Sequence, residues 1–318
     1  MKEKLLVLKK TYQSWMNNEP FEHSAVVAYY TLFSLPSLLL IITWIAGYFF
    51  KRSNVEEKLI AQISDITGPE TANSIQSMIG SAAIEEGSFI TLIISIGVLV
   101  FGATGAFFQL KKAMNNIWSV RPKNDNIMGI ILDRAISLGM IFVIGFLMLI
   151  SLVISTLVSY LSDYISVYAP KITSYGVGVL NFILSYIFIG FLFASIIRLL
   201  PDIKIKWKTT FIGASLTTLL FLIGKYLLGF YFSESDPASA YGGASSVVLI
   251  LLWVYYSCLI LFFGAEFTVQ YALYKNEDIV PSNLAEPAYY QELEELEEKR
   301  REIERNKKDL DKLSEPRD

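Results

Sequence analysis

ASAYGGASSVVLILLWVYYSCLILFFGA, residues Ala238 to Ala265, is the stretch of sequence that decides the fold. No charged side chain occurs between Asp236 and Glu266, and a helix needs only about 20 apolar residues to cross the hydrocarbon core of a bilayer. The stretch therefore predicts a membrane span. Glu266 follows it and precedes a further apolar turn, which places a carboxylate at or near the edge of the hydrocarbon, where an ionised group is costly.

The composition predicts a membrane protein over most of the chain. Hydrophobic residues make up 53% of the 318 residues and charged residues only 18%, which is far from the composition of soluble domains. Long uncharged runs recur and predict six transmembrane helices, at about 24–50, 88–110, 135–162, 172–197, 209–233 and 243–272. The predicted fold class is thus an all-α polytopic membrane protein.

The distribution of Lys and Arg in the connections predicts the orientation of these spans. One set of alternate connections, beginning with the N-terminal segment, contains 13 basic residues, and the other set contains four. Because basic loops stay in the cytoplasm, both termini of this multi-pass protein are predicted to be cytoplasmic. The predicted organisation is an interfacial helix at 1–22, the transmembrane domain at 23–274 and a charged, partly helical cytoplasmic tail at 275–318.

Two connections carry patterns of their own. In the outer connection, residues 51–86, apolar residues recur at helical spacing on both sides of Gly68 and Pro69, which predicts two short amphipathic helices on the outer face. The inner connection PDIKIKWK, Pro201 to Lys208, alternates apolar and basic residues and predicts an extended interfacial segment with its apolar side in lipid. Its predicted contacts with anionic headgroups are Lys204, Lys206 and Lys208, although an ordinary basic loop with an aromatic anchor explains the same pattern.

Charged residues in or beside the spans are candidates for a substrate path, namely Glu266, Lys225, Asp133, Arg134 and Arg198. Glu266 is expected to form an ion pair with a basic residue of another helix, Arg134 first and Lys111 second, either as a structural lock or as part of a functional site. Lys225 either extends to the outer surface or lines an outward cavity for an anionic headgroup.

The first span contains Pro36, which removes a backbone hydrogen bond and predicts a kink, with Ser34 near the freed groups. A broken helix of this kind is also where transporters often place a binding site. His23 lies at the inner boundary of this span and is expected to be interfacial. Small residues in the second and fourth spans, among them Gly97, Gly102, Gly105 and Gly190, predict close helix packing.

Catalytic chemistry finds little support in the sequence. The chain has one histidine and one cysteine, Cys258 within a span, and no cluster of acids at metal-ligand spacing. It also lacks the phosphate-binding loop G-x-x-x-x-G-K-[ST] of nucleotide hydrolases. No catalytic residue, metal or cofactor is predicted, and the expectation is that the protein is not an enzyme and binds no nucleic acid.

Several segments resemble the YihY/BrkB family of bacterial inner-membrane proteins. They are HSAVVAYYTLFSLPSLLLII (His23 to Ile42), AMNNIW (Ala113 to Trp118), the pair Asp133 and Arg134, and LLWVYYSCLILFFGAEF (Leu251 to Phe267). The resemblance covers about Tyr12 to Tyr274, and the motifs have an order and spacing similar to those of the family. The resemblance implies the six-span frame. For function it gives only an indication, since members have been labelled ribonuclease BN, tied to serum resistance, or connected to lipid and lipopolysaccharide traffic.

Together these observations favour a transporter or flippase of an anionic lipid, or of another amphipathic substrate, without its own nucleotide site. The first alternative is a non-catalytic scaffold that recruits a cytoplasmic protein through the tail at 275–318, which holds 14 acidic and 9 basic residues. This tail is expected to contribute almost no apolar surface to the bundle. A membrane-tethered nuclease is the weaker alternative.

Overall fold

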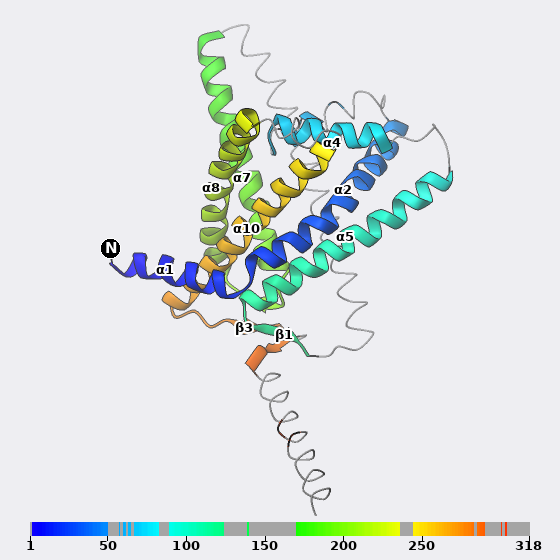
Figure 1. Cartoon of the computed structure of the whole chain (residues 1–318). Helices are drawn as coiled ribbons and strands as arrows, with labels where there is room; N and C mark the ends of the chain where they lie inside the picture. Colours follow the sequence, from blue (N-terminus) through cyan, green and yellow to red (C-terminus); the bar gives the residue numbers. More distant parts are fainter. Residues whose placement is uncertain are drawn as a thin grey trace, which may run out of the picture.

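The computed structural model describes residues 2–49, 67–82, 89–123, 170–235, 244–282 and 285–289, with single positions between 57 and 64 and at 139, 300 and 303. The described part is mainly helical, and its helices form a bundle (Figure 1). The helices are α1 (Lys2–Asn17), α2 (Pro20–Phe49), α4 (Pro69–Ala82), α5 (Phe89–Ile117), α7 (Pro170–Leu199), α8 (Trp207–Ser235) and α10 (Ser245–Tyr274).

The last long helix, α10, occupies the middle of the described bundle, between α8 and α2 (Figure 1). It packs against α1, α2, α4, α5 and α8. Its buried side chains, such as Ile250, Phe262 and Ala272, belong to the main hydrophobic core. The uncharged stretch from which the fold was predicted is therefore also the element around which the described helices assemble.

Helices α8 and α10 interlock through two reciprocal contacts of glycine with threonine. A Cβ atom added to Gly213 of α8 would lie 1.8 Å from Oγ1 of Thr268 on α10, and one added to Gly264 of α10 would lie 1.8 Å from Oγ1 of Thr217 on α8. Such small residues let two backbones approach closely. The predicted close packing is confirmed at Gly102 and Gly105, which face Ser34 and Tyr30 of α2, whereas nothing lies within 4 Å of a Cβ at Gly97.

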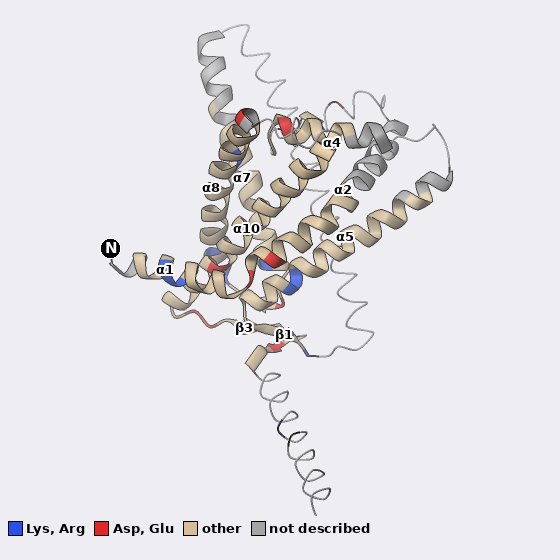
Figure 2. Ribbon diagram, in the orientation of Figure 1, with Lys and Arg blue, Asp and Glu red and all other residues tan. Residues whose placement is uncertain are grey.

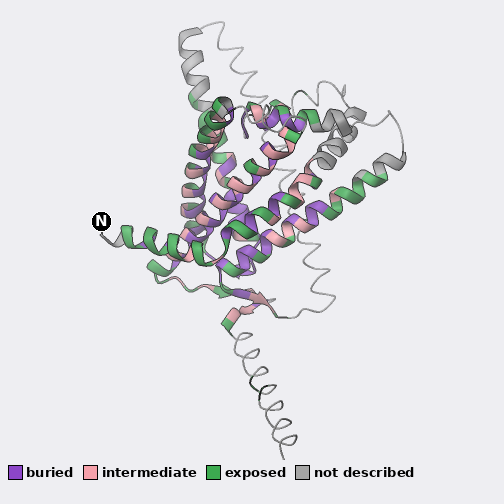
Figure 3. Ribbon diagram, in the orientation of Figure 1, coloured by how far each residue is buried: buried purple, intermediate pink, exposed green. Residues whose placement is uncertain are grey.

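Three described helices contain segments long and apolar enough to cross a membrane, Phe182–Leu199 in α7, Trp207–Phe232 in α8 and Ser245–Tyr274 in α10. The outward faces of the bundle carry many exposed apolar side chains, including Phe101 of α5, Phe182 of α7 and Phe230 of α8 (Figure 3). Apolar outer faces are expected of helices surrounded by lipid. The predicted span at 135–162 lies outside the described residues except at 139, and the orientation of the termini remains a prediction.

The break predicted in the first outer connection is confirmed. Gly68 has a φ of +94°, in the left-handed region that favours glycine, and α4 begins at the next residue, Pro69. Helix α4 lies across one end of the bundle (Figure 1) and the Ser77 hydroxyl is 2.9 Å from that of Ser246 on α10. Helix α2 is continuous through Pro36, and the hydroxyl of Ser34 donates to the carbonyl of Thr31 at 3.2 Å.

At the opposite end, the chain after α10 folds back and forms two short antiparallel sheets. Strand β3 (Val280–Pro281) pairs with β2 (Ile203–Lys204), and β4 (Ala285–Pro287) pairs with β1 (Val120–Pro122). Ala285 is buried in the core, and Glu277 accepts a hydrogen bond from Thr209 in the first turn of α8 at 2.8 Å. Residues 275–282 and 285–289 therefore pack on the bundle, and Ala285 adds buried apolar surface that was not expected of the tail.

The extended conformation predicted for PDIKIKWK is confirmed at β2, Ile203–Lys204, whereas Trp207 and Lys208 belong to the first turn of α8, and the two isoleucines do not face lipid. Ile203 and Ile205 are buried in the protein core, and Lys204 and Lys206 are exposed. Pairing of β2 with β3 turns the alternate side chains inward, because successive residues of a strand point to opposite faces. The expected lipid contact of these isoleucines is thus replaced by contact with the protein itself.

Candidate functional site

Charged residues gather at the end of the bundle where α1 meets α2, whereas the middles of the described helices are almost free of charge (Figure 2). Several of them are buried there, including His23, Lys111, Asn115, Asp202 and Glu266. By the charge distribution of the connections this end is predicted to be cytoplasmic. Burial of so many polar groups is costly unless each finds a partner, so their partners indicate what each does.

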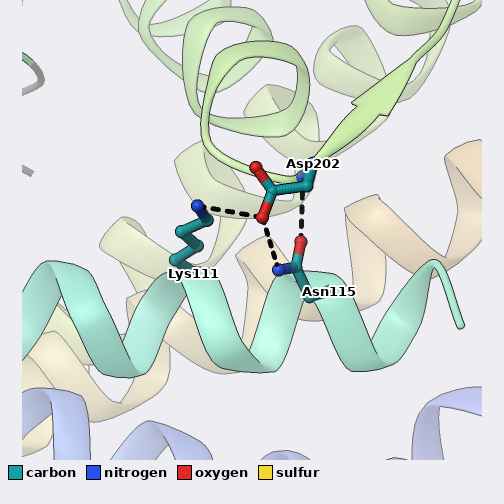
Figure 4. A network of polar contacts seen from close by, with 3 residues as sticks. All are labelled: Lys111, Asn115 and Asp202. Atoms are coloured by element: carbon teal, nitrogen blue, oxygen red, sulfur yellow. Dashed lines mark hydrogen bonds and ion pairs between the residues drawn. The ribbon is translucent and has the colours of Figure 1, made fainter. Parts of the chain in front are cut away.

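The best-satisfied group is the carboxylate of Asp202, in the connection between α7 and β2 (Figure 4). Lys111 Nζ lies 2.9 Å from Asp202 Oδ2, and Asn115 Nδ2 donates to the same oxygen at 3.0 Å. The backbone N–H of Asp202 donates in turn to Asn115 Oδ1 at 2.9 Å. Lys111 and Asn115 are four residues apart on α5 and so project from one face of the helix. This network holds the end of α5 to the connection between α7 and α8.

His23, near the start of α2, is buried and not merely interfacial as expected. Gln109 Nε2 lies 3.0 Å from its Nδ1 atom, and Asn116 Nδ2 lies 3.5 Å from its Nε2 atom. The ring also packs edge-on against Phe262 of α10, with the centroids 6.4 Å apart. Contacts to α5 and α10 fix the imidazole in one orientation at the polar end of the bundle.

Glu266 on α10 is fully buried, at 0% exposure, and its hydrogen-bond partners are neutral. Asn18, between α1 and α2, donates through Nδ2 to Glu266 Oε1, and the Ser14 side chain of α1 is a second hydrogen-bond partner. The other carboxylate oxygen, Oε2, has no hydrogen-bond partner within the described structure. Of the two bases expected to pair with it, Arg134 lies outside the described residues, and Lys111 pairs with Asp202.

An open pocket of about 380 Å³ lies beside these groups. It is lined by residues 17–19 of the turn from α1 to α2, by His23 and Asn116, and by residues 119–121 and 288–289 of the β1–β4 region. The backbone turns at two of its walls, since Glu19 and Ser119 have φ values of 48° and 52°. Asn18 belongs both to the pocket lining and to the hydrogen bond with Glu266, so the pocket and the buried carboxylate share one side chain.

The remaining predicted site residues lie apart from this pocket. Lys225 is partly buried on α8, and its neighbour Gly224 packs on Tyr256 of α10. Tyr256 is ten residues, or roughly 15 Å of helix, from Glu266, so Lys225 lies far from the buried acid. Arg198 lies over the ring of Trp207, 4.4 Å from its centroid, and Lys206 is 3.8 Å from Glu277. Asp133 lies outside the described residues, as does the side chain of Pro36.

The polar partners Asn18, Gln109, Asn115, Asn116 and Asp202 were not identified as site residues from the sequence. The available signal was the position of three resemblance motifs, because the segments that contain His23, Asn115 with Asn116, and Glu266 converge at this end. Within the described part of the chain, no group of three His, Cys, Asp or Glu side chains is placed to hold a metal ion.

Comparison with known proteins gives a family match over residues 11–287, to the family described as Virulence factor BrkB. A UPF0761 membrane protein of Psychromonas ingrahamii is 28% identical over 244 residues, which cover 76% of this chain and 79% of the relative. A second UPF0761 membrane protein, from Tolumonas auensis, is 22% identical over 249 residues, or 76% of this chain and 77% of the relative. No solved structure matches. The match extends past α10 to the end of β4, the region that folds back onto the bundle.

Proposed function

The chain belongs to the BrkB virulence factor family of membrane proteins, and we propose that it carries an anionic lipid, or another amphipathic anion, across the bacterial inner membrane. The headgroup enters the polar pocket at the cytoplasmic end while the apolar part of the molecule stays in the bilayer. The protein acts in this proposal as a binding and transport protein, not as an enzyme, and has no nucleotide site of its own.

The observation that carries the proposal is the polar pocket at the end of an otherwise apolar bundle. Its volume of about 380 Å³ lies within the range of about 300–1,000 Å³ typical of small-molecule sites. The lining includes the amide groups of Asn17, Asn18 and Asn116, the guanidinium of Arg121 and the carboxylate of Glu19. Amide and guanidinium donors are the groups that bind phosphate oxygens, and Arg does so with two parallel hydrogen bonds.

Two further features support passage across the membrane. A second hollow of about 540 Å³ lies at the opposite end, between α4 and residues 57–64, and its lining includes Glu57, Asn73 and Gln76. The helices between the two ends expose apolar faces along which acyl chains can lie. Lys225 on α8 lies between these ends as a basic residue that can lower the cost of moving a phosphate through hydrocarbon.

The test is the rate at which purified protein in liposomes flips a labelled phosphatidylglycerol between leaflets. Wild type is expected to accelerate flip over protein-free liposomes. Arg121→Ala should slow it by at least about fivefold, because the loss of even one of the two hydrogen bonds costs roughly 1 kcal/mol. Lys10→Ala, the same change of charge at an exposed position of α1 outside the pocket lining, is the matched control and should leave the rate unchanged.

Lys225→Ala extends the test to the membrane interior and should slow flip without loss of fold. Well-folded protein that accelerates the flip of none of the anionic lipids tested would refute the transport proposal. Equal rates for Arg121→Ala and Lys10→Ala would remove the pocket from the path.

A scaffold that recruits a cytoplasmic protein through residues 290–318 is the second candidate. One observation favours it: β4 pairs with β1, and Ala288 and Tyr289 line the pocket, so the segment that precedes the charged tail is fixed to the bundle. If the protein is such a scaffold, it should not accelerate lipid flip. Deletion of residues 290–318 should then abolish function in cells while the bundle stays folded. Transport that survives the deletion in cells and in liposomes would exclude it.

A further inference from the structure

Of the two acids buried at the polar end, Asp202 and Glu266, only Glu266 forms no ion pair with a described residue. Its side chain is completely shielded from solvent, Oε1 receives the Asn18 amide, and Oε2 receives no hydrogen bond within the described structure. An ionised carboxylate without a cation is expensive in such a place, and a neutral carboxylic acid is far less so. The geometry therefore suits a group that exchanges a proton.

The charged and titratable groups that the neighbouring helices offer at this end do not compensate the carboxylate. They include Lys9 and Lys10 on α1, Glu19 in the turn from α1 to α2, Glu22 and His23 on α2, Lys111 and Lys112 on α5, and Lys206 and Lys208 at the start of α8. Lys111 is paired with Asp202, His23 contacts Gln109 and Asn116, and the others are exposed. Among the described residues no ion pair reaches Glu266, and its partners come from Ser14 and Asn18.

Asn18 connects this carboxyl group to the pocket, because its side chain bonds to Glu266 and also lines the cavity. An anion held by the pocket lining would thus lie near Glu266 in surroundings of low dielectric. Two negative charges in such a site repel each other strongly, and the repulsion is removed when the carboxylate takes up a proton.

We propose that Glu266 is a proton-binding site coupled to the pocket, so that an anionic phosphodiester binds together with one proton. This inference rests on the proposed function, since it assigns the coupling ion of the same site. It makes the joint uptake of a singly charged lipid and a proton electrically neutral, which lowers the cost of passage through the hydrocarbon. The turn from α1 to α2, which carries Asn18, is the element through which the two sites communicate.

Thermodynamic linkage gives the direction of the effect. If the complex holds one proton more than the free protein, the affinity for the anion rises as the pH falls. The dissociation constant increases by up to about tenfold per pH unit while free Glu266 is ionised, and it becomes constant once free Glu266 is already protonated.

The experiment is calorimetric titration of the full-length protein with dihexanoyl phosphatidylglycerol from pH 5 to pH 9, in buffers that differ in their heat of ionisation. This lipid has a phosphodiester that does not titrate in that range, so proton uptake belongs to the protein. Wild type is expected to take up about one proton per lipid at the alkaline end and none at the acid end. Glu266→Gln should bind with an affinity independent of pH, close to that of wild type at pH 5, and without proton uptake from that side chain.

Two comparisons identify the group and the ligand. His23→Gln should weaken binding but retain the uptake of a proton, since His23 lines the pocket without being the coupled acid. Glycerophosphoglycerol, the same phosphodiester without acyl chains, separates a free headgroup ligand from a lipid, and proton uptake with either ligand supports the coupling.

The outcomes separate the two proposals. Absence of binding at every pH, in protein that is folded, would refute the proposed function itself. Binding that is independent of pH, or proton uptake that persists in Glu266→Gln and disappears in His23→Gln, would leave transport intact and overturn the role of Glu266.

Discussion

Asp202 and Glu266 are both buried at the polar end of the bundle, but their surroundings differ. Asp202 lies 2.9 Å from the ammonium of Lys111 and accepts a hydrogen bond from Asn115. Glu266 accepts a hydrogen bond from the neutral Asn18 amide on Oε1, and its Oε2 has no hydrogen-bond partner within the described residues. A buried carboxylate with a close cation and hydrogen bonds can remain ionised, whereas one with neutral partners is under pressure to take up a proton. The partners of a buried acid, more than its burial, therefore decide whether it is an anchor, meaning a fixed structural ion pair, or a group that changes its protonation state.

The largest effect is expected from breaking the anchor. Asp202→Ala removes the carboxylate beside the buried Lys111, and the loss of one partner of a buried pair costs about 3–5 kcal/mol. The free energy of unfolding, measured in mixed micelles of dodecyl maltoside and sodium dodecyl sulfate, should fall by this amount. The double variant Lys111→Met with Asp202→Ala should recover part of the loss, and a double variant no more stable than Asp202→Ala alone would argue against the ion pair as the cause.

In its described residues, the segment that folds back after α10 contacts Asp202 but not Glu266. Its removal should have the next largest effect on stability. Truncation after Tyr274 deletes β3 and β4, the hydrogen bond from Ser282 N–H to the Asp202 carbonyl at 2.8 Å, and the buried Ala285. At about 1 kcal/mol per hydrogen bond, a loss of roughly 2–4 kcal/mol is expected in the same unfolding measurement. Truncation after Tyr289 is the control and should leave the unfolding free energy unchanged. Equal stability of both truncated proteins would show that the sheets contribute nothing.

A packing variant two positions before Glu266 tests whether close contact with α8 holds α10 on the face away from that acid. Gly264→Ala places a methyl group against Thr217 of α8 and should destabilise the protein by about 1–3 kcal/mol, as overpacked sites do. Gly97→Ala adds the same methyl group where nothing lies within 4 Å and should be neutral or slightly stabilising. If thermal unfolding followed by the signal of tryptophan fluorescence shifted equally in both variants, the interlocked contact would not be the cause.

The smallest change in stability is expected at Glu266 itself. Glu266→Gln keeps the shape of the side chain and an oxygen that can accept from Asn18, so the unfolding free energy should change by less than about 1 kcal/mol. The contrast is with Asp202→Asn, which removes the charge opposite Lys111 and should be clearly more harmful. A loss at Glu266→Gln as large as that at Asp202→Asn would identify Glu266 as a second anchor.

The helices could be predicted from the sequence because each long uncharged run specifies its own element. The run from Ala238 to Ala265 indicated the helix on which the described bundle assembles, and Gly68 with Pro69 marked the start of α4. The small sheets could not be predicted in the same way. The alternation in PDIKIKWK predicts extended backbone at β2, but its partner β3 lies far away in the sequence, has only two residues and carries no periodic pattern of its own, so the pairing could not be predicted.

The polar end was predicted only in part for a related reason. Glu266 and Lys111 stood out as charges at the ends of apolar runs, but their partners are decided by the tertiary structure. Asn18 is 248 positions from Glu266, and Asn115 is 87 positions from Asp202, so no local spacing connects either pair. An asparagine in an inner connection looks like an ordinary loop residue until the fold brings a buried carboxylate to it.

The pairing of β1 with β4 also has a consequence for biogenesis. Val120 is paired with Pro287, so β1, which is synthesised in the first half of translation, can pair only after β4 has left the ribosome near the end of synthesis. The helices can enter the membrane one after another, but the polar end is closed only when residues 280–287 have been translated. Until then Asp202 lacks the hydrogen bond that its carbonyl accepts from the Ser282 N–H, and the last strand to emerge completes the polar end of the bundle.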